Sequence, residues 1–151
     1  MRPTEMREVV AAGELKGYRF RTERWGLEVL HRITVTGPIN LQRRIPLYEA
    51  TLAANPSANY FCIVDNRAGF ENAFSFEDIR YLAEVLKDGG ISHLHGVTIT
   101  DDQEYAKIVE LANITVAISS LQGELRSTHD VAEAEAFIQD RLAVFTAGRT
   151  L

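Results

Sequence analysis

The sequence has one cysteine, Cys62, among 151 residues, and it has no apolar run long enough to cross a bilayer. A lone cysteine has no partner for a disulfide within the chain, and its place in the apolar run 60–64 predicts a small buried hydrophobe. A membrane-spanning helix needs about 20 consecutive apolar residues, so no membrane span is expected. Residues 1–8 carry charges and lack the apolar stretch of a secretory signal. We therefore expect a cytoplasmic protein in a reducing compartment.

Positive charge is also scarce, since 16 Lys and Arg face 21 Asp and Glu, for a net charge of −5. Such a balance disfavours a broad phosphate-binding surface, so nucleic acid is not an expected partner. The densest basic spot is the pair Arg43 and Arg44. We interpret this pair as a solvated helix face.

Motifs that carry chemistry are missing too. The sequence contains neither a Gly-x-Ser-x-Gly elbow nor a Gly-rich phosphate loop. The four histidines (His31, His93, His95 and His129) have no metal-ligand spacing, and a helix cap explains the acidic group Asp101, Asp102 and Glu104. No catalytic residue, metal ligand or cofactor is therefore predicted. An enzyme whose residues meet only in the folded chain remains an alternative.

The residues that are present indicate an ordinary globular chain, with 46% hydrophobic and 25% charged residues. Alternating patterns predict a hairpin of strands 18–24 and 27–36. Strands are also expected at 60–64, 93–100 and 123–128, and helices from Asn40 to the Asn55-Pro56 break, at 75–88, from Asp102 onward and at 131–145. Pro46 should kink the first helix or delay its start. Residues 114–121 favour either a strand or a continued helix, and we prefer the helix.

This order predicts a single α/β domain over residues 17–151, with a mixed β-sheet, an N-terminal hairpin and βαβ units, about five strands and four helices. Residues 1–16 precede it. Their segment 8–13 is expected to be a short helix closed by Gly13, or a frayed arm.

The element order from 18 to 145 resembles that of STAS-like domains, the group that contains the bacterial anti-sigma factor antagonists, and more closely their STAS/SEC14-like relatives. The resemblance rests on Ile63-Val64-Asp65-Asn66-Arg67 at a strand end, the loop to Ser75, the helix to Asp88 and the stretch 124–138. In the antagonists a phosphorylatable Ser or Thr follows an Asp at the start of this helix. Ser75 is the matching position, but Phe74 stands where the family has the acidic residue.

The junction from Asp65 to Asp78 is the expected functional site, because open α/β sheets bind ligands beyond the carboxyl ends of their strands. The residues predicted to contact a ligand or partner are Asp65, Asn66, Arg67, Phe74 and Ser75. Arg67 is interpreted first as an ion-pair partner of Asp65 or Glu71 and second as an anion clamp. Ser75 followed by Asp78 is first a helix cap and second a candidate phosphorylation site.

Three functions follow from these patterns. The first is a non-catalytic STAS-like regulatory or binding module that recognises a protein or a small ligand at the 65–78 junction. The second is a SEC14-like pocket for a small molecule or lipid between the sheet and the helices, with the aromatic residues Tyr18, Phe20, Trp25, Phe70, Phe74 and Phe76 as its candidate lining. The third is an enzyme with an unrecognised site. If the chain forms a homodimer, the hairpin edge is the expected contact.

Overall fold

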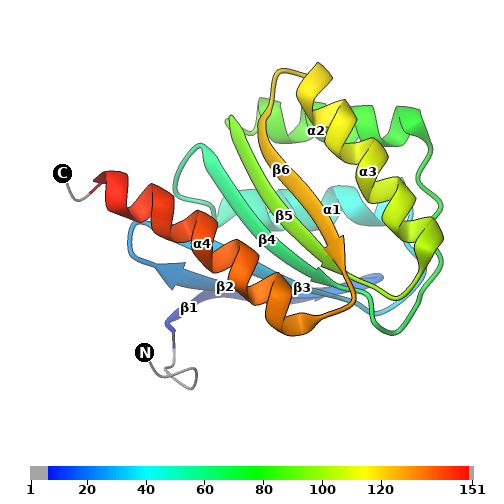
Figure 1. The fold of residues 1–151 in the computed structure, drawn as a ribbon, viewed down its shortest axis with the longest axis horizontal. Helices are drawn as coiled ribbons and strands as arrows, with labels where there is room; N and C mark the ends of the chain where they lie inside the picture. Colours follow the sequence, from blue (N-terminus) through cyan, green and yellow to red (C-terminus); the bar gives the residue numbers. More distant parts are fainter. Residues whose placement is uncertain (1–6, 150–151) are drawn as a thin grey trace.

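The computed structural model describes residues 7–149 of the chain, and only the backbone at 117, 118 and 146–149. Strands and helices follow one another along the chain (Figure 1). Their bounds are β1 Val9–Leu15, β2 Tyr18–Trp25, β3 Glu28–Val35, α1 Leu41–Ala53, β4 Asn59–Asp65, α2 Phe76–Asp88, β5 His93–Ile99, α3 Gln103–Ile118, β6 Gln122–Thr128 and α4 Val131–Arg149.

The strands form one mixed sheet in the order β1-β2-β3-β4-β5-β6. The first three strands are antiparallel, and β3 to β6 run parallel to one another. The predicted α/β class and hairpin are confirmed, but the sheet has six strands and not about five. The hairpin edge expected for self-association is not free, because β1 pairs with β2 along that side.

The additional strand is β1, which occupies a segment for which we predicted a short helix or a frayed arm. That prediction was wrong for residues 9–15, and residues 1–6 lie outside the described part of the chain. Gly13 is not a helix stop. A Cβ atom there would lie 3.0 Å from the ring of Phe20 on β2, so a larger residue at this strand position would require the ring to shift. Gly17, with φ +87°, then allows the tight turn into β2.

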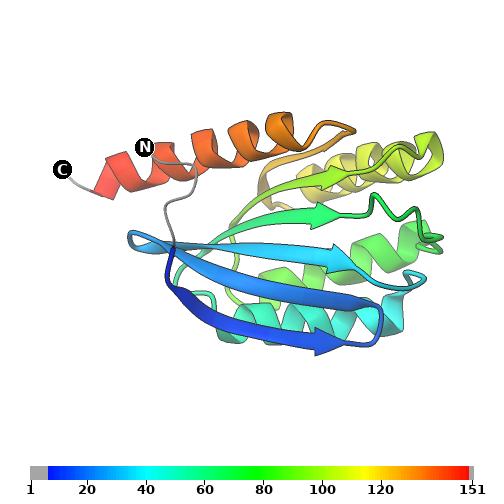
Figure 2. The ribbon, with the colours of Figure 1, turned by 90° about the horizontal axis from the view of Figure 1, so that it is seen from below.

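Helices cover both faces of the sheet. Figure 2 shows α1 and α2 on one side and α4 on the other. Tyr105 and Val109 of α3 pack in the same core as α1 and α2, so the three crossover helices share one face. The core on the α4 side joins Leu30, Phe61, Ile63, Val97, Ile99, Ala134, Ile138 and Leu142.

The helix ends agree closely with their sequence signals. Asn40 caps α1 by accepting a hydrogen bond from the Arg43 backbone, and the helix continues through Pro46 to Ala53. Pro46 therefore does not delay its start. The preferred helix across 114–118 is confirmed, because α3 reaches Ile118 before β6 begins at Gln122.

Candidate functional site

Asp65 and Arg67 form an ion pair at the carboxyl end of β4. The Arg67 side chain donates from Nε to Asp65 Oδ1 over 3.0 Å and from Nη2 to Oδ2 over 2.7 Å. These hydrogen bonds hold the pKa of the Asp65 carboxyl below its usual range. The ion-pair interpretation of Arg67 is thus confirmed, and the two charges neutralise each other.

Asn66 is buried and shapes the loop that follows. Its amide donates to the Phe70 carbonyl, and its side-chain oxygen accepts from the Phe70 backbone N–H. Its own backbone N–H donates to the Ile99 carbonyl of β5. Asn66 therefore ties the loop to the sheet.

Ser75 caps α2 as its sequence context predicted. Its hydroxyl accepts from the Asp78 backbone over 3.1 Å, and the Asp78 carboxylate accepts from the Ser75 backbone over 2.9 Å. This reciprocal capping box satisfies two amides that the helix leaves unpaired. The side chain is exposed at the start of α2. Phosphorylation of Ser75 stays a prediction.

The five predicted residues do not converge on one site. Asp65 and Arg67 border an open, charged groove of about 680 Å³ on the α4 side of the sheet. Arg32 in that groove is paired with Glu23 and Glu135, so much of its charge is neutralised internally. Phe74 instead lines a pocket on the opposite face.

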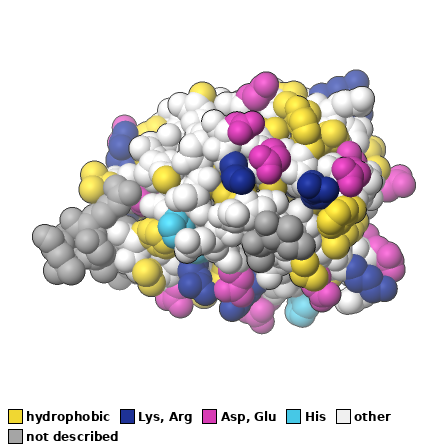
Figure 3. All heavy atoms as spheres, turned by 90° about the horizontal axis from the view of Figure 1, so that it is seen from above, with side chains coloured by type: hydrophobic (Ala, Val, Ile, Leu, Met, Phe, Trp, Pro, Cys, Tyr) yellow, Lys and Arg dark blue, Asp and Glu magenta, His cyan; other side chains and the backbone are white. Residues whose placement is uncertain are grey.

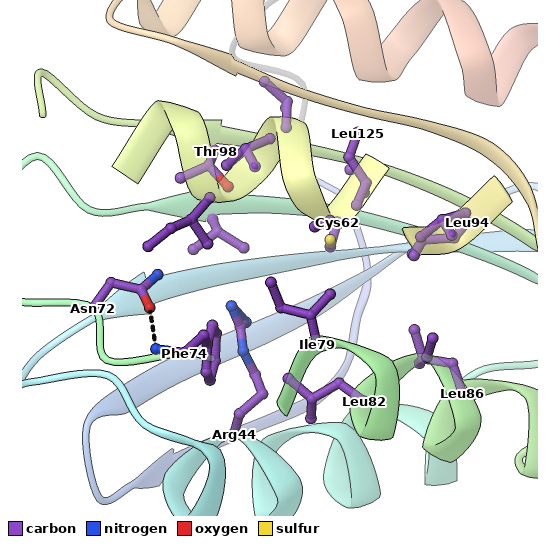
Figure 4. A pocket seen from close by; sticks show the side chains of 18 of the residues that line it. Arg44, Cys62, Asn72, Phe74, Ile79, Leu82, Leu86, Leu94, Thr98 and Leu125 are labelled. Carbon is purple, nitrogen blue, oxygen red and sulfur yellow. Dashed lines mark hydrogen bonds between the residues drawn. The ribbon is translucent and has the colours of Figure 1, made fainter. Parts of the chain in front are cut away.

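That second pocket lies between the sheet and helices α1, α2 and α3, with the loop at 72–74 along one side (Figure 4). Its volume is about 100 Å³. Most of its wall is apolar, including Ile79, Leu82, Leu86, Leu94 and Val116. Of the aromatic lining suggested by sequence, Phe74 is present. Tyr18, Phe20 and Phe70 pack in the core on this face without lining the pocket, Trp25 packs on the α4-side core, and Phe76 is exposed at the surface.

Arg44 brings a charge into this apolar pocket. It is only 8% exposed, and its guanidinium carbon lies 5.1 Å from the ring centre of Tyr18, 5.5 Å from that of Tyr48 and 5.4 Å from that of Phe74. Within residues 7–149 no carboxylate forms a salt bridge with it.

The prediction of a solvated basic face was therefore wrong for Arg44. The spacing of Arg44 with Leu47 and Thr51 places it on the buried stripe of α1, and this spacing is the signal that could have located it.

Cys62 also lines the pocket, from the centre of β4. Burial raises the pKa of its thiol to about 11, so the sulfur is protonated at neutral pH. The prediction of a buried cysteine is confirmed.

Outside the pocket, charges of both signs are interspersed on the face shown in Figure 3. Among the described residues, no group of three or more His, Cys, Asp or Glu side chains could hold a metal ion. No helix in that part of the chain is long and apolar enough to cross a membrane.

Comparison with solved structures identifies the fold. The crystal structure of an uncharacterized DUF3478-family protein from Shewanella loihica, which has a SpoIIAA-like fold, is similar over 81% of this chain and 94% of its own, with a TM-score of 0.53 and 16% identity. This chain has a SpoIIAA-like fold. The STAS-like resemblance is thereby confirmed for the fold, which at this identity is all that the similarity shows. No protein-family model and no curated protein sequence matches the chain.

Proposed function

We propose that this SpoIIAA-like chain is a non-catalytic binding module that holds a small, largely apolar molecule between its sheet and helices α1–α3. The observation that carries the proposal is the pocket of about 100 Å³ between the sheet, helices α1–α3 and Phe74. Protein interiors are otherwise close-packed, so a space of this size lined mainly by apolar side chains is suited to a small apolar group.

In this proposal, the 65–78 junction is the surface whose conformation depends on whether the pocket holds a ligand. Phe74 borders the pocket, and the neighbouring Ser75 caps α2 at the surface. A ligand that displaces the Phe74 ring would alter the loop and the start of α2. A protein partner that contacts this junction could then distinguish the filled from the empty state.

The chemistry of the pocket supports binding rather than catalysis. Its one thiol, Cys62, is protonated at neutral pH because burial raises its pKa to about 11. A thiol is a weak nucleophile compared with a thiolate. A buried, reduced cysteine also fits the cytoplasmic location that we propose.

Toluene, a neutral apolar probe, tests this function directly. We expect toluene to raise the melting temperature of the wild-type protein and to shift methyl NMR signals of Ile79, Leu82 and Leu94, which line the pocket. Ala83→Leu should abolish both effects, because Ala83 lines the same space and a leucine would fill it. Ala132→Leu is the matched control, since Ala132 is exposed on α4.

If toluene leaves the wild-type signals of the pocket methyl groups unchanged, the proposed function is wrong. This test uses wild-type protein alone, so it does not depend on whether either variant folds. Equal binding to wild type and to a folded Ala83→Leu protein would place the binding site elsewhere and would also overturn the proposal.

A further inference from the structure

We infer that the molecule held in this pocket carries a carboxylate, which Arg44 binds at the end of the pocket beside Asn72 and Phe74. The inference rests on the proposed function and names the chemical class of its ligand. Figure 4 shows the Arg44 guanidinium rising from α1 toward the sheet, between the side chains of Phe74 and Ile79.

Arg44 carries a buried charge that the described residues do not compensate. A guanidinium is always protonated in proteins, and a buried charge normally has a partner of opposite sign. Only 8% of Arg44 is exposed. Within the described residues its guanidinium lies near aromatic rings and forms no salt bridge. Ring faces attract a cation, but they do not neutralise it. The pocket therefore lacks one negative charge.

Hydrogen-bond donors are in surplus around that charge. Within residues 7–149, four buried polar atoms near Arg44 have no hydrogen-bond partner, namely Arg44 Nε, Asn72 Nδ2 and the hydroxyl oxygens of Tyr18 and Tyr105. Arg44 and Asn72 both come close enough to the Tyr105 hydroxyl to hydrogen-bond with it, so the three side chains meet at one point, where the Tyr105 oxygen can accept and its proton is left to donate. Burial raises the pKa of Tyr18 to about 12, so its hydroxyl keeps a proton to donate.

The orientation of Asn72 is fixed independently. Its Oδ1 accepts from the Phe74 backbone N–H over 2.9 Å, which leaves Nδ2 as the end of the amide without a partner (Figure 4). Of these residues, Arg44, Asn72 and Tyr105 line the pocket, so its wall offers donors from a guanidinium, an amide and a phenol, with the Tyr18 hydroxyl behind them. Its complement is a group made of acceptors alone, which describes an oxyanion.

A carboxylate fits better than a phosphate because the pocket contains a single buried cation. Arg126, the other cation in its wall, is exposed and hydrogen-bonded to Glu124. A phosphate monoester with almost two negative charges would leave one of them uncompensated in a dry environment. One carboxylate neutralises Arg44 and can accept two parallel hydrogen bonds from it.

The volume of the pocket limits the size of the ligand apart from its carboxylate. A cavity of about 150 Å³ accommodates benzene, and this pocket has about 100 Å³. The ligand body is therefore no larger than a single ring, and a short alkyl chain packed against Leu82, Leu86 and Leu94 meets that limit. A long-chain lipid would need more space than this pocket has.

The test compares benzoate and hexanoate with toluene, benzyl alcohol and inorganic phosphate, by calorimetric titration of the full chain. We expect benzoate or hexanoate to bind wild type at least about tenfold more tightly than benzyl alcohol. Arg44→Met should lower carboxylate affinity by at least about tenfold and leave toluene binding unchanged.

Two further variants sharpen the result. Asn72→Asp should also reduce carboxylate binding about tenfold, because it supplies a carboxylate beside Arg44 from the chain itself. Arg43→Met is the matched control, since the Arg43 side chain donates to the Pro38 carbonyl and does not line the pocket. It should bind both carboxylates as wild type does.

The outcomes separate the two claims. If toluene binds but the carboxylates bind no better than benzyl alcohol, the inference is wrong and the proposed function stands. Unchanged carboxylate binding in Arg44→Met, or tighter binding of phosphate than of benzoate, also overturns the inference. If toluene does not bind either, the proposed function itself fails.

Discussion

At the scale of single residues, buried polar groups that the fold leaves unsatisfied lie on both faces of the sheet. Arg44 lies on the α1 side, and His95 lies on the α4 side with both ring nitrogens unpartnered within the described chain. His95 packs against the rings of Phe61 and Phe145 at centroid distances of 5.2 Å. An unpaired buried donor or acceptor costs about 1–3 kcal/mol, so each is a place where a substitution can stabilise the fold.

Arg44→Met should leave the free energy of unfolding unchanged or raise it by about 1 kcal/mol. The variant loses cation–π contacts of about 0.5–2 kcal/mol, but it removes the larger desolvation penalty of a buried charge without a counter-ion. Urea denaturation of the ligand-free protein measures this. A loss of more than about 2 kcal/mol would show that Arg44 serves the fold rather than a ligand.

Stability should fall as the pH drops from about 6.5 to about 4. Burial lowers the pKa of both His31 and His95 to about 4, below the value of about 6.5 in an unfolded chain. Between these values the unfolded state binds protons that the native state does not, so acidification favours unfolding. Below about pH 4 both states are protonated, and the contribution of these histidines to the slope ends.

Denaturation curves at several pH values test this for His95→Phe against wild type. The variant keeps an aromatic ring and removes one of the two titrating groups, so it should lose roughly half of the histidine-dependent decline. An identical decline in both proteins would assign the effect to other groups.

His31 differs from His95 in being fully satisfied. The Asn55 amide donates to the carbonyls of Ser57 and Asn59, so its Oδ1 faces His31 Nε2 at 2.9 Å and accepts from it. His31 Nδ1 then accepts from the Thr22 hydroxyl at 2.8 Å. This assigns the neutral ring with its proton on Nε2.

At the scale of elements, α2 shows how local sequence alone fixes a helix. Ser75 and Asp78 form the capping box, and Ile79, Leu82, Ala83 and Leu86 form its buried stripe. These are neighbours along one helix, so the sequence displays them in order. The same helix also supplies part of the pocket wall.

Ser75→Ala should lower the free energy of unfolding by about 1 kcal/mol, because the Asp78 amide loses its acceptor. Ser75→Asp should remain close to wild type, since aspartate is an equally good N-cap. Thermal and urea denaturation distinguish the two variants. If both lose the same stability, the cap is not the reason for the effect.

At the scale of the whole molecule, the two faces of the sheet differ in how completely they are filled. The α4 face has a continuous apolar core in which Ile138 is fully buried. The opposite face contains the pocket with Arg44. We therefore expect the α4 face to respond to truncation of side chains as an ordinary close-packed core.

Ile138→Ala should cost about 2–5 kcal/mol, through lost burial and the cavity that it leaves. Val144→Ala on the same helix is the control, because Val144 is 64% exposed and its truncation should stay within about 0.5 kcal/mol. A small effect of Ile138→Ala would mean that α4 is packed loosely on the sheet.

The sequence by itself determined the α/β class, the hairpin, the Ser75 cap and the burial of Cys62. Each follows from periodicity or from residues within one turn of a helix, which act over short distances along the chain. It did not reveal β1, since the small residues of 9–15 carry a weak strand pattern and gain their partner only by pairing with β2.

Only the tertiary structure decided the candidate site. Tyr18, Arg44, Asn72 and Tyr105 come from a strand, two different helices and a loop, and no local pattern connects them. Crossover connections bring them to one face of the sheet. Arg44 is buried there without a counter-ion among the described residues, whereas its neighbour Arg43 on α1 is not buried. The same folding separates Asp65 and Arg67 from Phe74, because they lie on opposite faces of the sheet.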